Sequence, residues 1–142
     1  MIYSKIEKSD IALLTSPKAI DFFDCWKESQ YLSSFEEGRF FGYIVKNDQE
    51  AMGFITLTIG IDDADIESVY VFSKYRKLGV AVSLIEKCLE ELKGRVKKVF
   101  LEVRKGNSPA INLYKKCGFC QISIRKKYYE DGEDALVFVK EL

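Results

Sequence analysis

The segment Arg76-Lys77-Leu78-Gly79-Val80-Ala81 has the residue types and the spacing of an anion site. A strand-like run at 65–72 ends just before it, and a helical pattern at 80–92 begins inside it. Its glycine and its small last residue let the backbone approach a ligand closely, and the free N–H groups in a helix's first turn bind anions. The two basic residues at its start add positive charge. The spacing predicts a site for a diphosphate or a similar group.

Histidine does not occur in the 142 residues. Ser-His and Cys-His nucleophile pairs and histidine-ligated metals are therefore excluded, which leaves carboxylates, Tyr, Lys, Cys or water as proton carriers. Any catalysis by this chain is expected to rely on carboxylate and phenol groups.

One C-x-x-C motif, Cys117-Gly118-Phe119-Cys120, raises two other possibilities, a redox dithiol and half of a zinc site. A zinc site would need Cys25, Cys88 or carboxylates as further ligands, because the sequence has no histidine and no second C-x-x-C pair. A thioredoxin-like pair opens a helix, whereas this pair closes a helical pattern. We expect small buried thiols and no metal.

Composition indicates an ordinary globular protein with one domain spanning residues 1–142, because 47% of the residues are hydrophobic and 31% are charged. Basic and acidic residues number 22 each, so no overall charge points to nucleic acid or an acidic membrane as a partner. The N-terminal residues lack the apolar stretch of a signal peptide, and no apolar run is long enough to span a bilayer. We expect a cytoplasmic protein, monomeric or weakly dimeric.

Short strands and helices alternate along the chain without a linker or repeat. Aromatic and β-branched runs at 39–46 and 51–61 flank a polar turn and predict an antiparallel hairpin. Ser108 is expected as the N-cap of a late helix that begins with Pro109 and stops at Gly118. Further strands are expected at 2–6, 65–72, 99–104, 121–128 and 134–141, and helices at 10–23, with a break near 16–17, and at 80–92.

The strand at 65–72, the helix at 80–92 and the strand at 99–104 form a right-handed β-α-β crossover with parallel strands. A Rossmann domain would need G-x-G-x-x-G in its first turn, whereas this turn reads R-x-x-G-x-A. The anion site is therefore expected to take a phosphate-bearing cofactor other than a dinucleotide.

This turn resembles the cofactor signature Q/R-x-x-G-x-G/A of the GNAT superfamily of N-acetyltransferases. The later motifs Leu101-Glu102-Val103-Arg104, Leu113-Tyr114 and Gly118-Phe119, with Tyr128-Tyr129 and Glu133-Asp134-Ala135, are similar to those of the ribosomal-protein-alanine N-acetyltransferases. The resemblance implies an α/β (α+β) fold of the GNAT type. Its central sheet would be mixed and mostly antiparallel, with a splayed parallel strand pair and flanking helices.

The resemblance also implies acetyl-CoA as co-substrate. The pantetheine arm would pair with the backbone of the strand at 65–72, and the pyrophosphate would take the N–H groups of the following turn. The cofactor residues so implied are Val69, Tyr70, Val71, Arg76, Lys77, Leu78, Gly79, Val80, Ala81, Val82, Asn107 and Tyr114. The departures from the family pattern include Tyr70, which replaces a small residue, Phe72-Ser73, which replaces Asp-Pro, and Val82, which replaces a basic residue.

Transfer of an acetyl group to an amine needs one group to take the ammonium proton and another to protonate the thiolate. Strand alternation places Glu102 on the face opposite the core, and we expect it to be the general base, with Glu67 as the alternative. Tyr114 resembles the general acid of the family. In the alternative interpretation Glu102 pairs with Arg104 or Lys126, and Tyr114 only packs on the sheet.

Tyr128 and Tyr129 either wall a groove for an acceptor peptide, as the resemblance implies, or are ordinary hairpin aromatics. The resulting hypothesis is an acetyl-CoA-dependent N-acetyltransferase that acts on a protein N-terminus, such as that of a ribosomal protein, by direct attack in a ternary complex. The alternatives are acetylation of a small-molecule amine or a lysine side chain, and a catalytically silent module that binds CoA or a partner protein.

Overall fold

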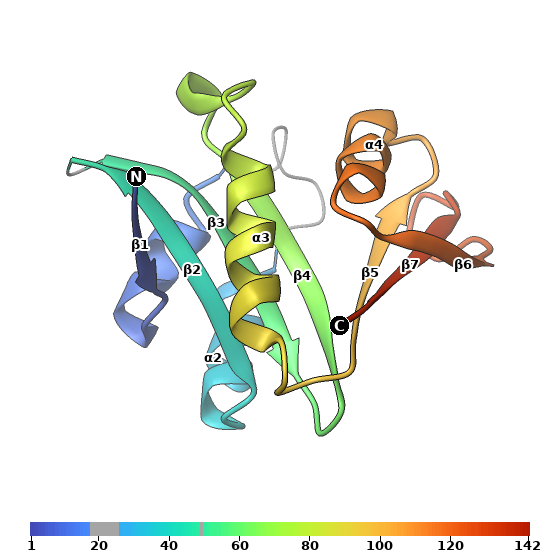
Figure 1. Ribbon diagram of the computed structural model, residues 1–142, viewed down its shortest axis with the longest axis horizontal. Coiled ribbons are helices and arrows are strands. Elements are labelled where there is room, and N and C mark those ends of the chain that lie inside the picture. The colour runs from blue at the N-terminus through green and yellow to red at the C-terminus, as the bar shows by residue number, and fades with distance from the viewer. Residues whose placement is uncertain (18–25, 49) are drawn as a thin grey trace.

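The computed structural model describes residues 1–17, 26–48 and 50–142. Within these residues, seven strands form a sheet with the order β1-β2-β3-β4-β5-β7-β6 (Figure 1). Neighbouring strands are antiparallel except for the parallel pair β4 and β5, which confirms the predicted mixed sheet. The strands are β1 (Ile2–Lys5), β2 (Phe40–Asn47), β3 (Glu50–Ile59), β4 (Asp63–Val71), β5 (Lys98–Arg104), β6 (Cys120–Arg125) and β7 (Ala135–Glu141).

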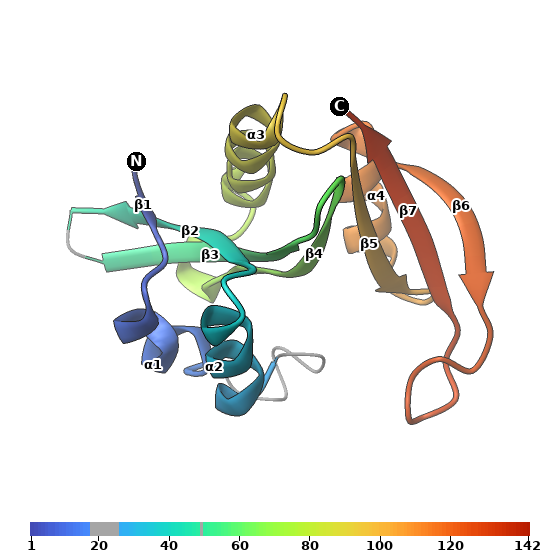
Figure 2. The same ribbon diagram turned by 90° about the horizontal axis from the view of Figure 1, so that it is seen from below.

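Helices cover both faces of this sheet (Figure 2). α3 (Val80–Leu92) lies on one face of the β1–β4 half, while α1 (Ile11–Leu14) and α2 (Glu28–Glu36) lie on the other. α4 (Ser108–Lys116) follows β5, and 3-10 turns occur at η1 (Lys8–Asp10) and η2 (Ser73–Tyr75). In the described ranges, none of the helices has the length and the apolar character needed to cross a membrane.

Two hydrophobic clusters hold the layers together. The larger cluster joins α3 and α4 to the sheet, with Leu84, Ile85 and Phe138 almost fully buried. The smaller cluster fastens α1 and α2 to the opposite face through Leu14, Tyr31 and Phe54. An apolar stripe of α3 packs on the sheet, because the buried residues of this helix are Val80, Leu84, Ile85, Cys88 and Leu92.

The N-terminal third departs most from the sequence prediction. The helix expected at 10–23 ends at Leu14, and the hydroxyls of Thr15 and Ser16 donate to carbonyls of the preceding turn, at 3.0 Å and 2.6 Å. Its later part, 18–25, lies outside the described residues. α2 was not predicted. At its start the side chain of Gln30 accepts a hydrogen bond from the N–H group of Lys27, at 2.8 Å.

Smaller corrections concern element ends. The N-cap of α4 is Asn107 and not Ser108, because the Asn107 side chain accepts from the N–H of Ala110 at 3.2 Å. β6 ends at Arg125 rather than continuing to 128, because Lys127 adopts a left-handed φ of 52° and its N–H donates to Asp134, at 2.9 Å.

The parallel pair β4–β5 is short. It runs only from Asp63 opposite Lys98 to Ile66 opposite Leu101, and beyond this point the two strands diverge (Figure 1). Glu67, the next residue of β4, is an extra residue in the pairing with β3, since Ser68 lies opposite Thr56 while Ile66 lies opposite Leu57. A bulge of this kind bends a strand and raises its twist. The sheet therefore splays open where the bulge begins.

A buried hydrogen bond between the hydroxyls of Thr56 and Ser68 lies directly beside the bulge. Both residues are almost fully buried, so removal of one hydroxyl leaves the other without a partner.

We predict that Thr56→Val and Ser68→Ala each lower the free energy of unfolding by about 1–3 kcal/mol. The double variant should lose less than the sum of the two, because it leaves no buried hydroxyl unpaired. Urea unfolding of the four proteins measures this, and strictly additive losses would contradict the coupling.

Candidate active site

The diverging halves of β4 and β5 border a cleft of about 1280 Å³, lined also by the start of α3, by α4 and by the loop between β6 and β7. Leu78 is not among the lining residues, and its side chain is 65% exposed. The other residues predicted for the site all line the cleft: Glu67, Val69, Tyr70, Val71, Arg76, Lys77, Gly79, Val80, Ala81, Val82, Glu102, Asn107, Tyr114, Tyr128 and Tyr129.

One wall of the cleft is a strand edge that has no neighbouring strand among the residues that the structure describes. The N–H of Phe72 donates to the carbonyl of Met52 on β3, at 2.9 Å. Because hydrogen-bonded pairs alternate along an antiparallel ladder, the peptide groups of Val69 and Val71 point away from β3. On that side β5 pairs only as far as Ile66. This edge can pair with an extended ligand that carries amide groups.

The floor at one end is the turn that enters α3. Gly79 is the N-cap of this helix and has a left-handed φ of 78°. The N–H groups of Val80, Ala81 and Val82 precede the first intrahelical bond, in which Ser83 donates to Gly79 at 3.1 Å. They have no partner within α3 and can bind an anion, which the positive end of the helix dipole favours.

Arg76 is fixed beside this turn. Its Nε donates to the carbonyl of Val71 at 2.9 Å, and its Nη2 lies 3.4 Å from the hydroxyl of Tyr70. The guanidinium also lies over the Tyr70 ring, at 5.5 Å from the ring centroid. The large residue at position 70, which departs from the family pattern, therefore supports the basic side chain that opens the anion site.

Tyr114 projects from α4 and is only 9% exposed. Burial raises the pKa of its hydroxyl far above the usual range, so the phenol keeps its proton at neutral pH. Asn107 lies at the start of the same helix, where its side-chain carbonyl caps α4.

Carboxylates gather at the other end of the cleft. Burial raises the pKa of Glu67, and the neighbouring Asp65 and Glu102 raise it further. Desolvation and Glu102 also raise the pKa of Asp65. The Glu102 side chain is 31% exposed, and its Oε2 lies 3.8 Å from Nε of Arg125. The sequence predicted Arg104 or Lys126 as the alternative ion-pair partner of Glu102, whereas this contact is made by Arg125.

Sequence reasoning missed Asp65 and Arg125 as parts of this end. Asp63, Asp65 and Glu67 recur at every second position, which is a signal for one face of a strand. Arg125 carried no such signal, because its approach to Glu102 depends on the order of β5, β7 and β6 in the sheet.

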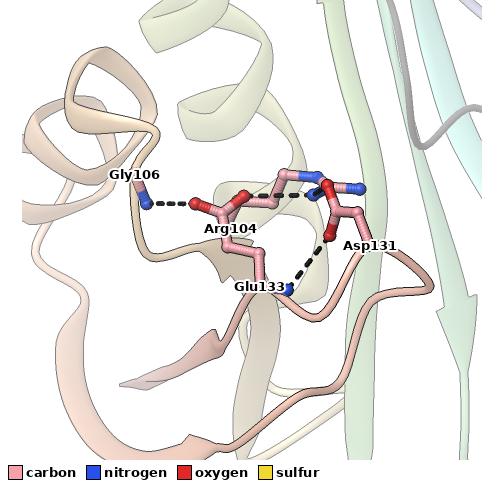
Figure 3. Close-up of polar contacts among 4 residues, drawn as sticks. All are labelled: Arg104, Gly106, Asp131 and Glu133. Carbon is pink, nitrogen blue, oxygen red and sulfur yellow. Dashed lines mark hydrogen bonds and ion pairs between the residues drawn. The ribbon is translucent and has the colours of Figure 1, made fainter.

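A loop at 126–134 closes this end of the cleft. Arg104, the last residue of β5, binds it through Nη1, at 2.7 Å from Asp131 and 3.0 Å from Glu133 (Figure 3). The Arg104 guanidinium lies 4.1 Å from the ring centroid of Tyr129. Tyr128 lies beside Glu102, and partial burial and this carboxylate raise the pKa of its hydroxyl.

The cysteines lie away from this arrangement. Cys88 is buried in α3, where burial raises its pKa, and Cys117 caps the end of α4, while Cys120 is exposed. The prediction of small buried thiols is thus wrong for Cys120. Cys25 lies outside the described residues. In the part of the chain that the structure describes, no three potential ligands are placed to hold a metal ion.

Residues 9–119 match the model of the acetyltransferase (GNAT) family. The chain belongs to this family. An N-alpha-acetyltransferase of Sulfurisphaera tokodaii is 33% identical over 118 residues, 81% of this chain and 71% of that protein. The [ribosomal protein bS18]-alanine N-acetyltransferase of Escherichia coli is 32% identical over 116 residues, 79% of this chain and 78% of that protein. The crystal structure of the Escherichia coli ribosomal-protein-S18-alanine N-acetyltransferase has a TM-score of 0.88 at 28% identity, covering 99% and 92% of the two chains.

Membership makes this GNAT protein an acetyl-CoA-dependent N-acetyltransferase. The geometry of the cleft also fits acetyl-CoA, independently of the family match. The edge of β4 beyond its pairing with β5 offers peptide groups to the amides of a pantetheine arm, and the N–H groups of the first turn of α3 suit a pyrophosphate.

Gly79 and Gly94 offer a matched pair, since both have left-handed φ angles and open space around an added Cβ, but only Gly79 lines the cleft. We predict that alanine at either position lowers the free energy of unfolding by about 1–2 kcal/mol. Only Gly79→Ala should weaken acetyl-CoA binding, by roughly tenfold in Kd. Calorimetric titration measures this, and equal affinity of the two variants would contradict the anion site.

Glu67 generates a pH-dependent prediction. Burial in the folded protein raises the pKa of Glu67, so the charged carboxylate lowers the free energy of unfolding at a pH above that pKa. This loss disappears at a pH low enough to protonate the group in both the folded and the unfolded protein. Glu67→Gln should therefore raise the melting temperature at neutral pH, and the gain should shrink as the pH falls through the acid range. The control is Asp63→Asn on the same strand, where the side chain is exposed. A gain that persists at acid pH would contradict the assignment.

Proposed function

We propose that this GNAT enzyme acetylates the N-terminal α-amine of a protein, such as a ribosomal protein, by direct attack of the amine in a ternary complex. The observation that carries the proposal is the division of the cleft. One end offers free N–H groups and positive charge, whereas the other offers three carboxylates and two tyrosines. Two of the relatives support this choice of acceptor, because one is named an N-alpha-acetyltransferase and the other a [ribosomal protein bS18]-alanine N-acetyltransferase.

The positive end is proposed to hold acetyl-CoA. Backbone groups of Val69 and Val71 would bind the pantetheine arm, with Tyr70 between them supporting Arg76. Backbone N–H groups from Lys77 to Val82 would bind the pyrophosphate, and Asn107 would contact the co-substrate from α4. The co-substrate supplies the acetyl group as a thioester, so the enzyme needs no nucleophilic side chain.

Glu102 is proposed to act as the general base, directly or through one water molecule. An ammonium group must lose a proton before its nitrogen can attack the carbonyl carbon, and the carboxylates at this end attract the positive charge. Glu67 is the alternative base, because burial raises its pKa towards the working range. The two carboxylates are close enough for Glu102 to affect the pKa of Glu67.

Tyr114 is proposed to act as the general acid. When the new C–N bond forms and the C–S bond breaks, the departing sulfur carries a negative charge. The Tyr114 phenol is protonated at neutral pH and lines the cleft, so it can donate its proton to that sulfur and regain one from solvent.

Tyr128 and Tyr129 are proposed to form the wall against which the acceptor chain lies. Their rings meet edge to face at 5.1 Å between centroids, and Tyr128 remains 50% exposed. An exposed aromatic surface beside the base suits an extended peptide better than a small polyamine, because it offers contacts beyond the reacting amine.

The test is a panel of acceptors with acetyl-CoA, followed by mass spectrometry. It contains peptides with a free N-terminal alanine, the same peptides blocked at the N-terminus but carrying a lysine, and polyamines. We expect acetylation of the free α-amine, and a fall in kcat of about a hundredfold or more for Glu102→Gln and Tyr114→Phe. Glu141→Gln, an exposed carboxylate on β7, is the control and should leave kcat unchanged.

Other outcomes select the alternatives. Preference for polyamines or for the blocked lysine peptide would replace the N-terminal acceptor. If Glu67→Gln abolishes turnover while Glu102→Gln does not, Glu67 is the base. A chain that acetyl-CoA stabilises but that acetylates no amine would be a silent binding module.

A further inference from the structure

The Arg104 contacts shown in Figure 3 connect segments that are far apart in sequence. Nη1 of Arg104 binds Asp131 and Glu133, which lie 27 and 29 residues further along the chain. The second carboxylate oxygen of Glu133 accepts from the N–H of Gly106, at 2.9 Å. A single glutamate thus ties the loop at 126–134 both to the end of β5 and to the turn that enters α4.

The same loop is closed on itself by backbone and side-chain hydrogen bonds. The N–H of Glu133 donates to Asp131 at 3.0 Å, and the N–H of Tyr129 donates to the carbonyl of Glu133 at 3.2 Å. At the base of the loop, the backbone N–H of Lys127 donates to the side chain of Asp134, and the backbone N–H of Lys105 donates to the carbonyl of Asp134. The loop therefore behaves as one unit whose position depends on its attachment to β5.

The attachment also lies on the same face of β5 as the proposed base. Arg104 and Glu102 are two residues apart on β5, so their side chains lie on the same face of the strand. Two carboxylates bind the Arg104 guanidinium, whose side chain is only 21% exposed, and Tyr129 covers it. The guanidinium of Arg104 is thus held between the loop and the end of β5.

We infer that Arg104 is a positioning residue of the acceptor channel. By binding Asp131 and Glu133 it fixes the loop at 126–134, and with it Tyr128 and Tyr129, against β5. This inference rests on the proposed function in one respect, namely that the acceptor lies along these tyrosines. Arg104 itself does not touch the reacting atoms.

Two conservative variants test the clamp. Arg104→Lys keeps the charge but loses the planar fork that binds two carboxylates. Glu133→Gln keeps an oxygen for the N–H of Gly106 but loses the ion pair. The matched control is Glu141→Gln, which removes the ion pair with Lys98 at the opposite end of the same strands β5 and β7.

Kinetics and proteolysis give independent readouts. Both variants should raise the KM for an alanine-starting peptide by roughly tenfold, while the KM for acetyl-CoA stays within about twofold. Without any substrate, trypsin should cleave after Lys126 or Lys127 several times faster than in the unsubstituted protein. Glu141→Gln should behave as the unsubstituted protein in both measurements.

Unchanged loop cleavage in both variants would overturn the clamp. So would a KM that rises equally for the peptide and for acetyl-CoA, because it would mean general destabilisation. If the unsubstituted protein acetylates no peptide, the proposed function fails, and the cleavage rates alone still decide whether Arg104 holds the loop.

Discussion

The early end of the pairing between β4 and β5 is the constraint on which the site depends. Two parallel strands that start in register would normally continue as neighbours, and their peptide groups would satisfy each other. Here the pairing stops at Ile66, one residue before the bulge at Glu67. The result is a cleft inside a continuous sheet, bordered by peptide groups that another extended molecule can pair with. The larger hydrophobic cluster remains continuous, because α3 and α4 both contribute to it.

The two ends of the cleft differ in charge because different elements meet there. At the C-terminal end of β4 the chain turns into α3, which brings free N–H groups, a helix dipole and Arg76 together. Near the bulge, Asp65 and Glu67 of β4 lie close to Glu102 of β5, and burial together with the repulsion between these carboxylates raises the pKa of Asp65 and of Glu67. Arg104, the cation nearest in sequence to Glu102, binds Asp131 and Glu133. This division suits an anionic donor at one end and a cationic acceptor at the other.

Local patterns predicted the features that depend on neighbouring residues. The turn from Arg76 to Ala81, the bounds of α3 and the alternation of β5 follow from spacing alone, because glycine and apolar periodicity act within a few residues. The bulge at Glu67 was not predictable, since it exists only in the register between β3 and β4. The contacts of Arg104 and Arg125 likewise require the final order of the strands. Asn107 displaced Ser108 as the cap because two adjacent residues were both good caps, and only the hydrogen bond to Ala110 decides between them.

Residue-resolved hydrogen exchange of the β4 amides, with and without acetyl-CoA, tests most directly whether the open edge of this strand is the binding surface. The N–H of Tyr70 should exchange slowly in both states, because its peptide group faces β3. The N–H groups of Val69 and Val71 should exchange faster in the free protein and become protected when acetyl-CoA binds. Bound acetyl-CoA that leaves the exchange of Val69 and Val71 unchanged would contradict the account.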